Sequence, residues 1–160
     1  MTLVLLMMIL MILISKPIDT KAAEIPEASV EFVEDGIIVH GPAFPALYLS
    51  NQDMCELKGV ATNEAGNQGV KGMALVMRVV LNRLARGGYG NDIHSVIYAP
   101  SQFATTNMPL HHWSKECEIA LQWVIWGWDE SEDALYFCSG GGYNGPIPLF
   151  KYKDHWFATK

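Results

Sequence analysis

One carboxylate, Glu64 in residues 60–84 (VATNEAGNQGVKGMALVMRVVLNRL), stands where an apolar helical pattern ends and a glycine-containing turn follows. Apolar residues recur at helical spacing up to this position, so the pattern puts Glu64 on the apolar face of its helix. The helix macrodipole and desolvation would both disfavour a negative charge there. An acid that keeps its proton can donate it to a leaving oxygen. A structural acid paired with Arg78 or Arg83 would fit the same pattern, so both roles stay open.

Two helices have to position this acid. The first is expected to begin at Ser50, which forms a variant capping box with Asp53, and to end at Gly66-Asn67. The second is expected over residues 70–84 and is apolar on most of its surface, which is typical of a buried helix. Gly87-Gly88 should end it.

The rest of the chain adds shorter elements. Residues 91–100 (NDIHSVIYAP) predict a short helix, and residues 114–128 predict another that Ser114 caps. The acidic run 129–133 (DESED) reads as a solvated turn. Residues 134–139 (ALYFCS) and 155–159 (HWFAT) read as strands that flank a glycine-rich segment. The predicted fold class is therefore α+β, mostly helical with a short C-terminal β element.

The first 49 residues differ in character from the rest. Residues 23–49 form a polar, proline-containing lead-in, in which an alternating pattern around Asp35-Gly36 favours a β-ribbon or an extended arm. Residues 2–14 are almost continuously apolar but shorter than the roughly 18–20 residues of a membrane-spanning helix. We therefore interpret residues 1–22 as a secretory signal peptide, with 20–22 as its cleavage site. Because no basic residue precedes the apolar run, a membrane anchor with transient membrane association remains the alternative. We expect an exported protein in the periplasm, cell wall or extracellular space.

Composition excludes several classes of function. The formal net charge is −6 and no basic run occurs, so nucleic acid is not an expected partner. Cys55, Cys117 and Cys138 form no CxxC pair, which argues against structural zinc and leaves either one disulfide or three separate thiols. A metalloenzyme such as a zinc amidase, built from His111-His112, His155 and an acidic residue, is a rival interpretation, but no HExxH-like motif supports it. We expect one domain, a monomer, with no metal and no cofactor.

Four blocks of the chain, in order, resemble the family of SleB-type cell-wall hydrolases, which includes spore-cortex-lytic enzymes and phage and bacterial peptidoglycan hydrolases. The family signature runs Glu-Ala-Arg-Gly-Glu, three residues, Gly, an apolar helix and Asn-Arg. Glu64-Ala65, Gly72 and Asn82-Arg83 match it. Residues 95–105 (SVIYAPSQFAT) resemble the family's Val-Ile-Tyr and Gln-Phe segment. Residues 134–139 and 153–158 (KDHWFA) resemble its Ala-x-x-Phe strand and its terminal His-x-Phe.

The resemblance covers residues 50–160 and implies a small lysozyme-like catalytic domain. It implies a partner, the glycan strands of peptidoglycan, and cleavage of the β-1,4 bond between N-acetylmuramic acid and N-acetylglucosamine, usually as a lytic transglycosylase. The first Glu of the signature is the family's proposed catalytic acid and corresponds to Glu64. Gln68 replaces the second Glu of the signature, and Gly66-Asn67 replace its Arg-Gly.

The loss of the second Glu bears on mechanism. A retaining or inverting glycosidase needs two carboxylates. A lytic transglycosylase can work with one, because the 6-hydroxyl of the muramic acid attacks within the same sugar. A muramidase that recruits Asp92, Glu116 or Asp154 as second carboxylate stays an alternative, as does a peptidoglycan-binding module without activity.

Other polar and aromatic side chains are candidates for binding the glycan. Amides can bond the N-acetyl groups and hydroxyls, aromatic rings can line a sugar groove, and a histidine can bond substrate or tune Glu64. Each type also has an ordinary structural role in a core or on a surface. The candidates are Gln68, Asn82, Gln102, Phe103, Tyr136, His155 and Trp156.

Overall fold

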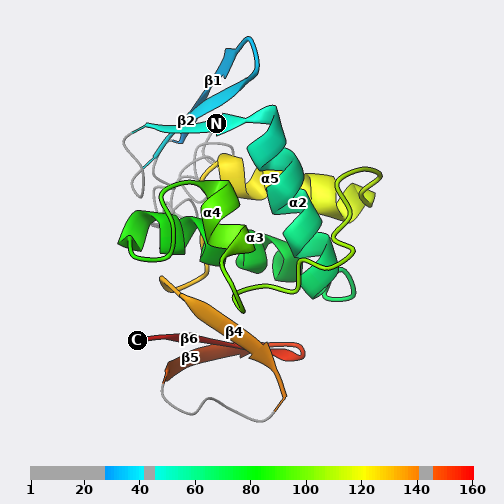
Figure 1. The fold of residues 1–160 in the computed structure, drawn as a ribbon, viewed down its shortest axis with the longest axis vertical. Coiled ribbons are helices and arrows are strands. Elements are labelled where there is room, and N and C mark those ends of the chain that lie inside the picture. Colours follow the sequence, from blue (N-terminus) through cyan, green and yellow to red (C-terminus); the bar gives the residue numbers. More distant parts are fainter. Residues whose placement is uncertain (1–27, 42–45, 141–145) are drawn as a thin grey trace, which may run out of the picture.

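The computed structural model describes residues 28–41, 46–140 and 146–160. Figure 1 shows strands β1 and β2 at one end of the molecule, the helices in the middle, and strands β4, β5 and β6 at the other end. The fold is α+β, as predicted. The expected signal peptide or anchor, residues 1–22, lies outside the described residues, within which no helix is both long and apolar enough to cross a membrane.

The described part of the chain contains the helices α2 (Asn51–Ala65), α3 (Gly69–Arg86), α4 (Ile93–Tyr98) and α5 (Lys115–Ile125), and local sequence signals mark several of their ends. The predicted capping box at α2 is present, because the Ser50 side chain accepts from the Asp53 N–H while the Asp53 carboxylate accepts from the Ser50 N–H. Ser114 caps α5 as expected, and Gly87 ends α3 with a φ of 74°. Such signals act within one turn, which is why the sequence alone revealed them.

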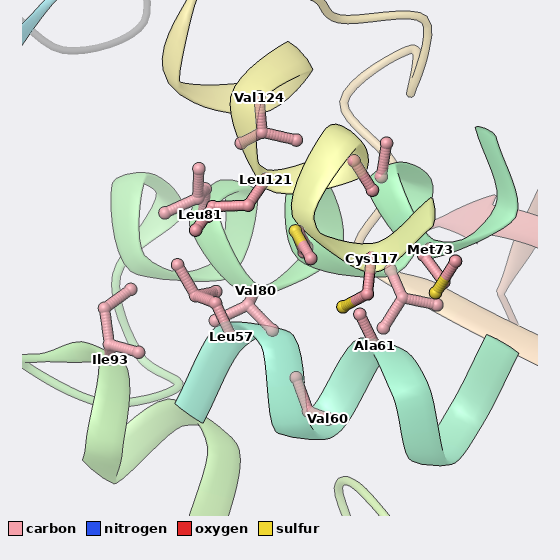
Figure 2. Packing of buried hydrophobic residues seen from close by; sticks show 14 of the residues in the cluster. Leu57, Val60, Ala61, Met73, Val80, Leu81, Ile93, Cys117, Leu121 and Val124 are labelled. Atoms are coloured by element: carbon pink, nitrogen blue, oxygen red, sulfur yellow. The ribbon is translucent and has the colours of Figure 1, made fainter. Parts of the chain in front are cut away.

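Helices α2, α3 and α5 bury one shared apolar core. Figure 2 shows how the side chains of the three helices meet, with Leu57, Val60 and Ala61 from α2 facing residues of the other two. Twelve consecutive residues of α3, from Gly72 to Arg83, are buried, so α3 is the central helix that the apolar pattern predicted. Cys117 lies inside this core, and all three cysteines are free thiols.

The lead-in is a packed sheet rather than an extended arm. Strands β1 (Ser29–Val33), β2 (Gly36–His40) and β3 (Leu47–Ser50) form an antiparallel sheet in the order β1-β2-β3. Ile37, Val39 and Leu49 from its inner face belong to the same core as the helices. The first sheet and the helices therefore share one core across the domain boundary expected at residue 50.

A second antiparallel sheet closes the other end of the molecule. Its strands are β4 (Tyr136–Ser139), β5 (Ile147–Tyr152) and β6 (His155–Thr159), in the order β4-β6-β5. Strand β5 was not among the predicted elements, and it contains a proline, Pro148. As an edge strand, β5 tolerates a proline, since only one side of the strand needs hydrogen-bond donors for pairing.

The acidic run 129–133 is a solvated turn, as predicted, since its four acidic residues are exposed, but it also makes contacts that its composition did not suggest. Asp129 forms an ion pair with the buried Arg78 of α3, and its Oδ1 accepts hydrogen bonds from the backbone and hydroxyl of Ser131 at 2.9 and 2.6 Å. Ser131 is itself fully buried. This turn therefore attaches the C-terminal sheet to the central helix.

Candidate active site

Glu64 lies in the last turn of α2, and its carboxylate is fixed by a loop that is distant in sequence. Its Oε1 accepts a hydrogen bond of 2.6 Å from the backbone N–H of Ala104, whose carbonyl accepts in turn from the Asn63 side chain. The side chain is half-buried and follows the buried Val60 and Ala61 at helical spacing, so it lies at the end of the apolar face of α2. Ala61 and Ala65 fill that face. Arg78 pairs with Asp129, and the Nε of Arg83 donates to a backbone carbonyl.

The carboxylate opens into a polar cleft of about 450 Å³. The end of α2, the turn before α3, the end of β4 and the turn between β5 and β6 build it. Its lining residues are Thr62, Asn63, Glu64, Gly66, Asn67, Gln68, Ser139, Asp154 and His155. A space of this size with hydrogen-bonding groups on several sides suits a sugar better than an apolar ligand.

Gln68 reaches the cleft, but its amide is already engaged. It is 2% exposed, and its Nε2 donates to Asp154 Oδ2 at 3.0 Å and to Asn67 Oδ1 at 2.8 Å. Its Oε1 accepts from the Asp154 N–H at 3.4 Å. The Nζ of Lys153 donates to its backbone carbonyl at 2.6 Å. Gln68 therefore joins the start of α3 to the β5–β6 turn, rather than offering a free amide to a ligand.

His155 lines the same cleft from the first position of β6. It is 5% exposed, and its Nδ1 is buried without a hydrogen-bond partner among the described residues. Its ring packs against Phe137, with the centroids 5.2 Å apart. Burial lowers the pKa of His155 below its ordinary value, while Glu64 and Asp154 oppose that shift as negative charges. Burial therefore favours the neutral imidazole, and the two carboxylates favour the charged form.

Comparison with known proteins places this cleft in a family. The family model for cell wall hydrolases matches residues 67–158, more than half of the chain. The chain belongs to the cell wall hydrolase family. It is thus an enzyme that acts on the peptidoglycan of the wall.

Solved structures agree with this hydrolase in fold. The crystal structure of the catalytic domain of the Bacillus cereus SleB protein superposes with a TM-score of 0.63 at 21% identity, covering 69% of this chain and 91% of that one. The catalytic domain of the germination-specific lytic transglycosylase SleB from Bacillus anthracis gives 0.62 at 23% identity, covering 69% and 97%. No curated protein matches the sequence.

Several predicted site residues of the hydrolase lie outside the cleft. Asn82 is buried in α3, where its Nδ2 donates to Ser131 Oγ at 2.9 Å and to the Ala134 carbonyl at 3.0 Å. Tyr136 shares a hydrogen bond of 2.7 Å with the Tyr89 hydroxyl. That bond is the main reason why the pKa of Tyr136 is raised. These two residues serve packing and anchoring in this structure.

Phe103, Gln102 and Trp156 are also absent from the cleft lining. Phe103 packs in the core, with its ring 6.0 Å from that of Phe137 and under the guanidinium of Arg83. Its loop matters nonetheless, because the next residue binds Glu64. Gln102 is half-buried in that loop. Trp156 follows His155 on β6, so its side chain leaves the opposite face of the sheet.

Other lining residues were missed or left open by sequence reasoning. Asn63 directly precedes Glu64 in the sequence and was not singled out, and Ser139 lines the cleft only because the fold brings β4 there. Ala104, which binds Glu64, also reaches it only through the fold. Of the three acids considered as a second carboxylate, Asp154 alone lines the cleft; Asp92 caps α4 and Glu116 is exposed on α5. Within the described residues, no cluster of His, Cys, Asp and Glu side chains is arranged to hold a metal ion.

Proposed function

We propose that this hydrolase cleaves the β-1,4 bond between N-acetylmuramic acid and N-acetylglucosamine as a lytic transglycosylase, with Glu64 as its catalytic acid. The observation that carries the proposal is a carboxylate fixed by a backbone N–H at the edge of an open, polar cleft. The fold likeness to a lytic transglycosylase domain and the resemblance at Glu64-Ala65 support it.

The contacts of Glu64 suit the transfer of one proton in each direction. The Ala104 N–H occupies Oε1, and among the described residues no hydrogen bond reaches Oε2. A proton on Oε2 passes to the glycosidic oxygen as the bond to the muramic C1 breaks, and the bonding electron pair leaves with that oxygen. The 6-hydroxyl of the same muramic acid then bonds to C1 and returns its proton to Oε2. The intramolecular attack forms a 1,6-anhydro ring and needs no second carboxylate for activation.

The test compares the soluble products that the purified chain and its variants release from peptidoglycan, identified by mass spectrometry. Wild type should release 1,6-anhydromuropeptides, and Glu64→Gln should lower the rate by at least about 100-fold, which is the scale of losing a general acid. Glu116→Gln is the matched control, because Glu116 is exposed on α5 and outside the cleft. Muropeptides with reducing muramic acid would indicate hydrolysis by water instead. Equal release by wild type and Glu64→Gln would refute the role of Glu64.

We further propose that the chain is exported, because its substrate lies in the wall. The apolar residues 2–14 support a signal peptide or an anchor. Cell fractionation with N-terminal sequencing tests this: a mature N-terminus near residue 23 outside the cytoplasm is expected for cleavage, and the full chain in the membrane fraction for an anchor. The full chain in the cytosol alone would contradict export.

A further inference from the structure

The turn between β5 and β6 brings a second acid, Asp154, into the cleft that holds Glu64. We infer that Asp154 is a second working carboxylate of this site, which stabilises positive charge on the sugar, and that Gln68 is its positioning residue. The inference rests on the proposed function and adds to it the groups that stabilise the reacting sugar.

The first support is the way in which Asp154 is held. Gln68 contacts it twice, through Nε2 to Oδ2 at 3.0 Å and through Oε1 from the backbone N–H at 3.4 Å. Gln68 is almost fully buried at the start of α3, so the side chain that holds Asp154 is itself held by packing. Glutamate at position 68 could accept but not donate, and would face Asp154 with like charge.

The second support is the packing that seats Gln68 itself. A Cβ at position 72 would overlap the Cβ of Gln68 and touch the Tyr152 ring, so only glycine leaves room for this arrangement. The Lys153 ammonium secures the other side by donating to the Gln68 carbonyl at 2.6 Å. Residues from α3 and from the β5–β6 turn thus fix one carboxylate in one place.

The third support is the charge that remains in the cleft. Among the described residues Asp154 forms no ion pair, and Oδ2 is its one oxygen with a hydrogen bond. Glu64 and His155 share the cleft with it, and Lys153 turns its ammonium to a backbone carbonyl. The Nδ1 of His155 is buried without a hydrogen-bond partner among the described residues. Buried polar groups are normally hydrogen-bonded, so this nitrogen is available to a ligand.

An uncompensated negative charge has a use in this reaction. When Glu64 protonates the glycosidic oxygen and the bond to C1 breaks, positive charge spreads over C1 and the ring oxygen. A fixed carboxylate stabilises that charge without forming a bond or moving a proton. The 6-hydroxyl still attacks, so the products are the same anhydromuropeptides.

The test uses the full chain and follows kcat, KM and products on peptidoglycan fragments. Asp154→Asn should lower kcat by about 10- to 100-fold. The loss should be smaller than for a carboxylate enclosed in protein, because solvent screens the charge of an exposed side chain. KM and the products should not change, and Asp154→Glu should recover much of the rate. Glu116→Gln is the control for loss of an acid elsewhere, and thermal unfolding verifies that each variant is folded.

Three results would overturn the inference. They are a kcat for Asp154→Asn within twofold of wild type, an equal loss in Asp154→Glu and Asp154→Asn, or a change in the ratio of anhydro to reducing products. The last result would make Asp154 a base for the nucleophile. If wild type releases no anhydromuropeptides, or Glu64→Gln keeps full activity, the proposed function fails instead, so the two failures are distinguishable.

The positioning role of Gln68 has its own test in a double-mutant cycle. Gln68→Met conserves volume but removes both contacts to Asp154, and it should lower kcat by less than Asp154→Asn does. The double variant should be no slower than Asp154→Asn alone, because Gln68 acts through that carboxylate. Additive losses would show that Gln68 acts on the sugar directly and would contradict the positioning role.

Discussion

Replacing Asn82 by alanine separates a structural amide from a substrate-binding one. The amide lies in the middle of α3 and is 8% exposed. It donates to the Ser131 hydroxyl at 2.9 Å and to the Ala134 carbonyl at 3.0 Å, and both residues are fully buried. The side chain thus connects the central helix to the segment that enters β4.

The expected loss of stability follows from what each partner retains. The Ser131 hydroxyl loses the hydrogen bond from Asn82 but keeps the one to Asp129. Losing that first bond should therefore lower the free energy of unfolding by about 1 kcal/mol, the net value of an ordinary hydrogen bond. The Ala134 carbonyl is left without this donor, at about 1–3 kcal/mol. Asn82 lines a second cavity of about 310 Å³ beside Arg86 and Asp133, where water can partly replace the amide. We expect a total near 2–3 kcal/mol, or roughly 5–10 °C in Tm.

The assay pairs thermal unfolding with activity measured well below Tm. Asn82→Ala should melt lower while its kcat and KM per folded molecule stay near wild type. Asn91→Ala, at an exposed position, is the control and should change stability by less than about 0.5 kcal/mol. A Tm within about 1 °C of wild type together with a raised KM would refute the reasoning and return Asn82 to the substrate site.

Three further outcomes follow from the same contacts. Burial lowers the pKa of His155 below its ordinary value of 6.5, so this histidine binds a proton more readily in the unfolded chain than in the folded one. The free energy of unfolding should therefore be greatest above about pH 6.5 and decrease as the pH falls. In His155→Gln the free energy of unfolding should depend less steeply on pH below about 6.5. The same dependence on pH as in wild type would contradict this prediction. Asp129→Ala should lower the free energy of unfolding by about 3 kcal/mol or more, because it leaves the buried Arg78 without its ion pair. Glu130→Ala removes only the exposed ion pair with Lys71 and should lower it by less than about 1 kcal/mol. Similar denaturation midpoints for the two variants would contradict this ranking. Gly72→Ala should lower kcat by displacing Gln68, although alanine favours a helix by about 1 kcal/mol, and unchanged kinetics would show that the turn can adjust.

Sequence reasoning was most accurate where the signal is local. The capping box at Ser50, the cap at Ser114 and the glycine stop at Gly87 are confirmed, because each depends on residues within one helical turn. The same holds for α3, whose apolar surface requires burial whatever covers it. Sequence reasoning missed β5, an edge strand that contains Pro148 and pairs with β6.

The sequence by itself predicted the helices, the fold class and the family, and it indicated Glu64 as the candidate catalytic acid. Tertiary structure alone decided what surrounds that acid. Ala104 binds Glu64 from 40 positions away, and Asp154 meets Gln68 across 86 positions. Likewise, Asp129 proved to be an anchor for Arg78. Spacing along the chain carries no information on such contacts, because they form only when the core brings α2, α3 and the C-terminal sheet together. Charge and residue type show what chemistry a side chain can do, and packing decides which side chains share one cleft.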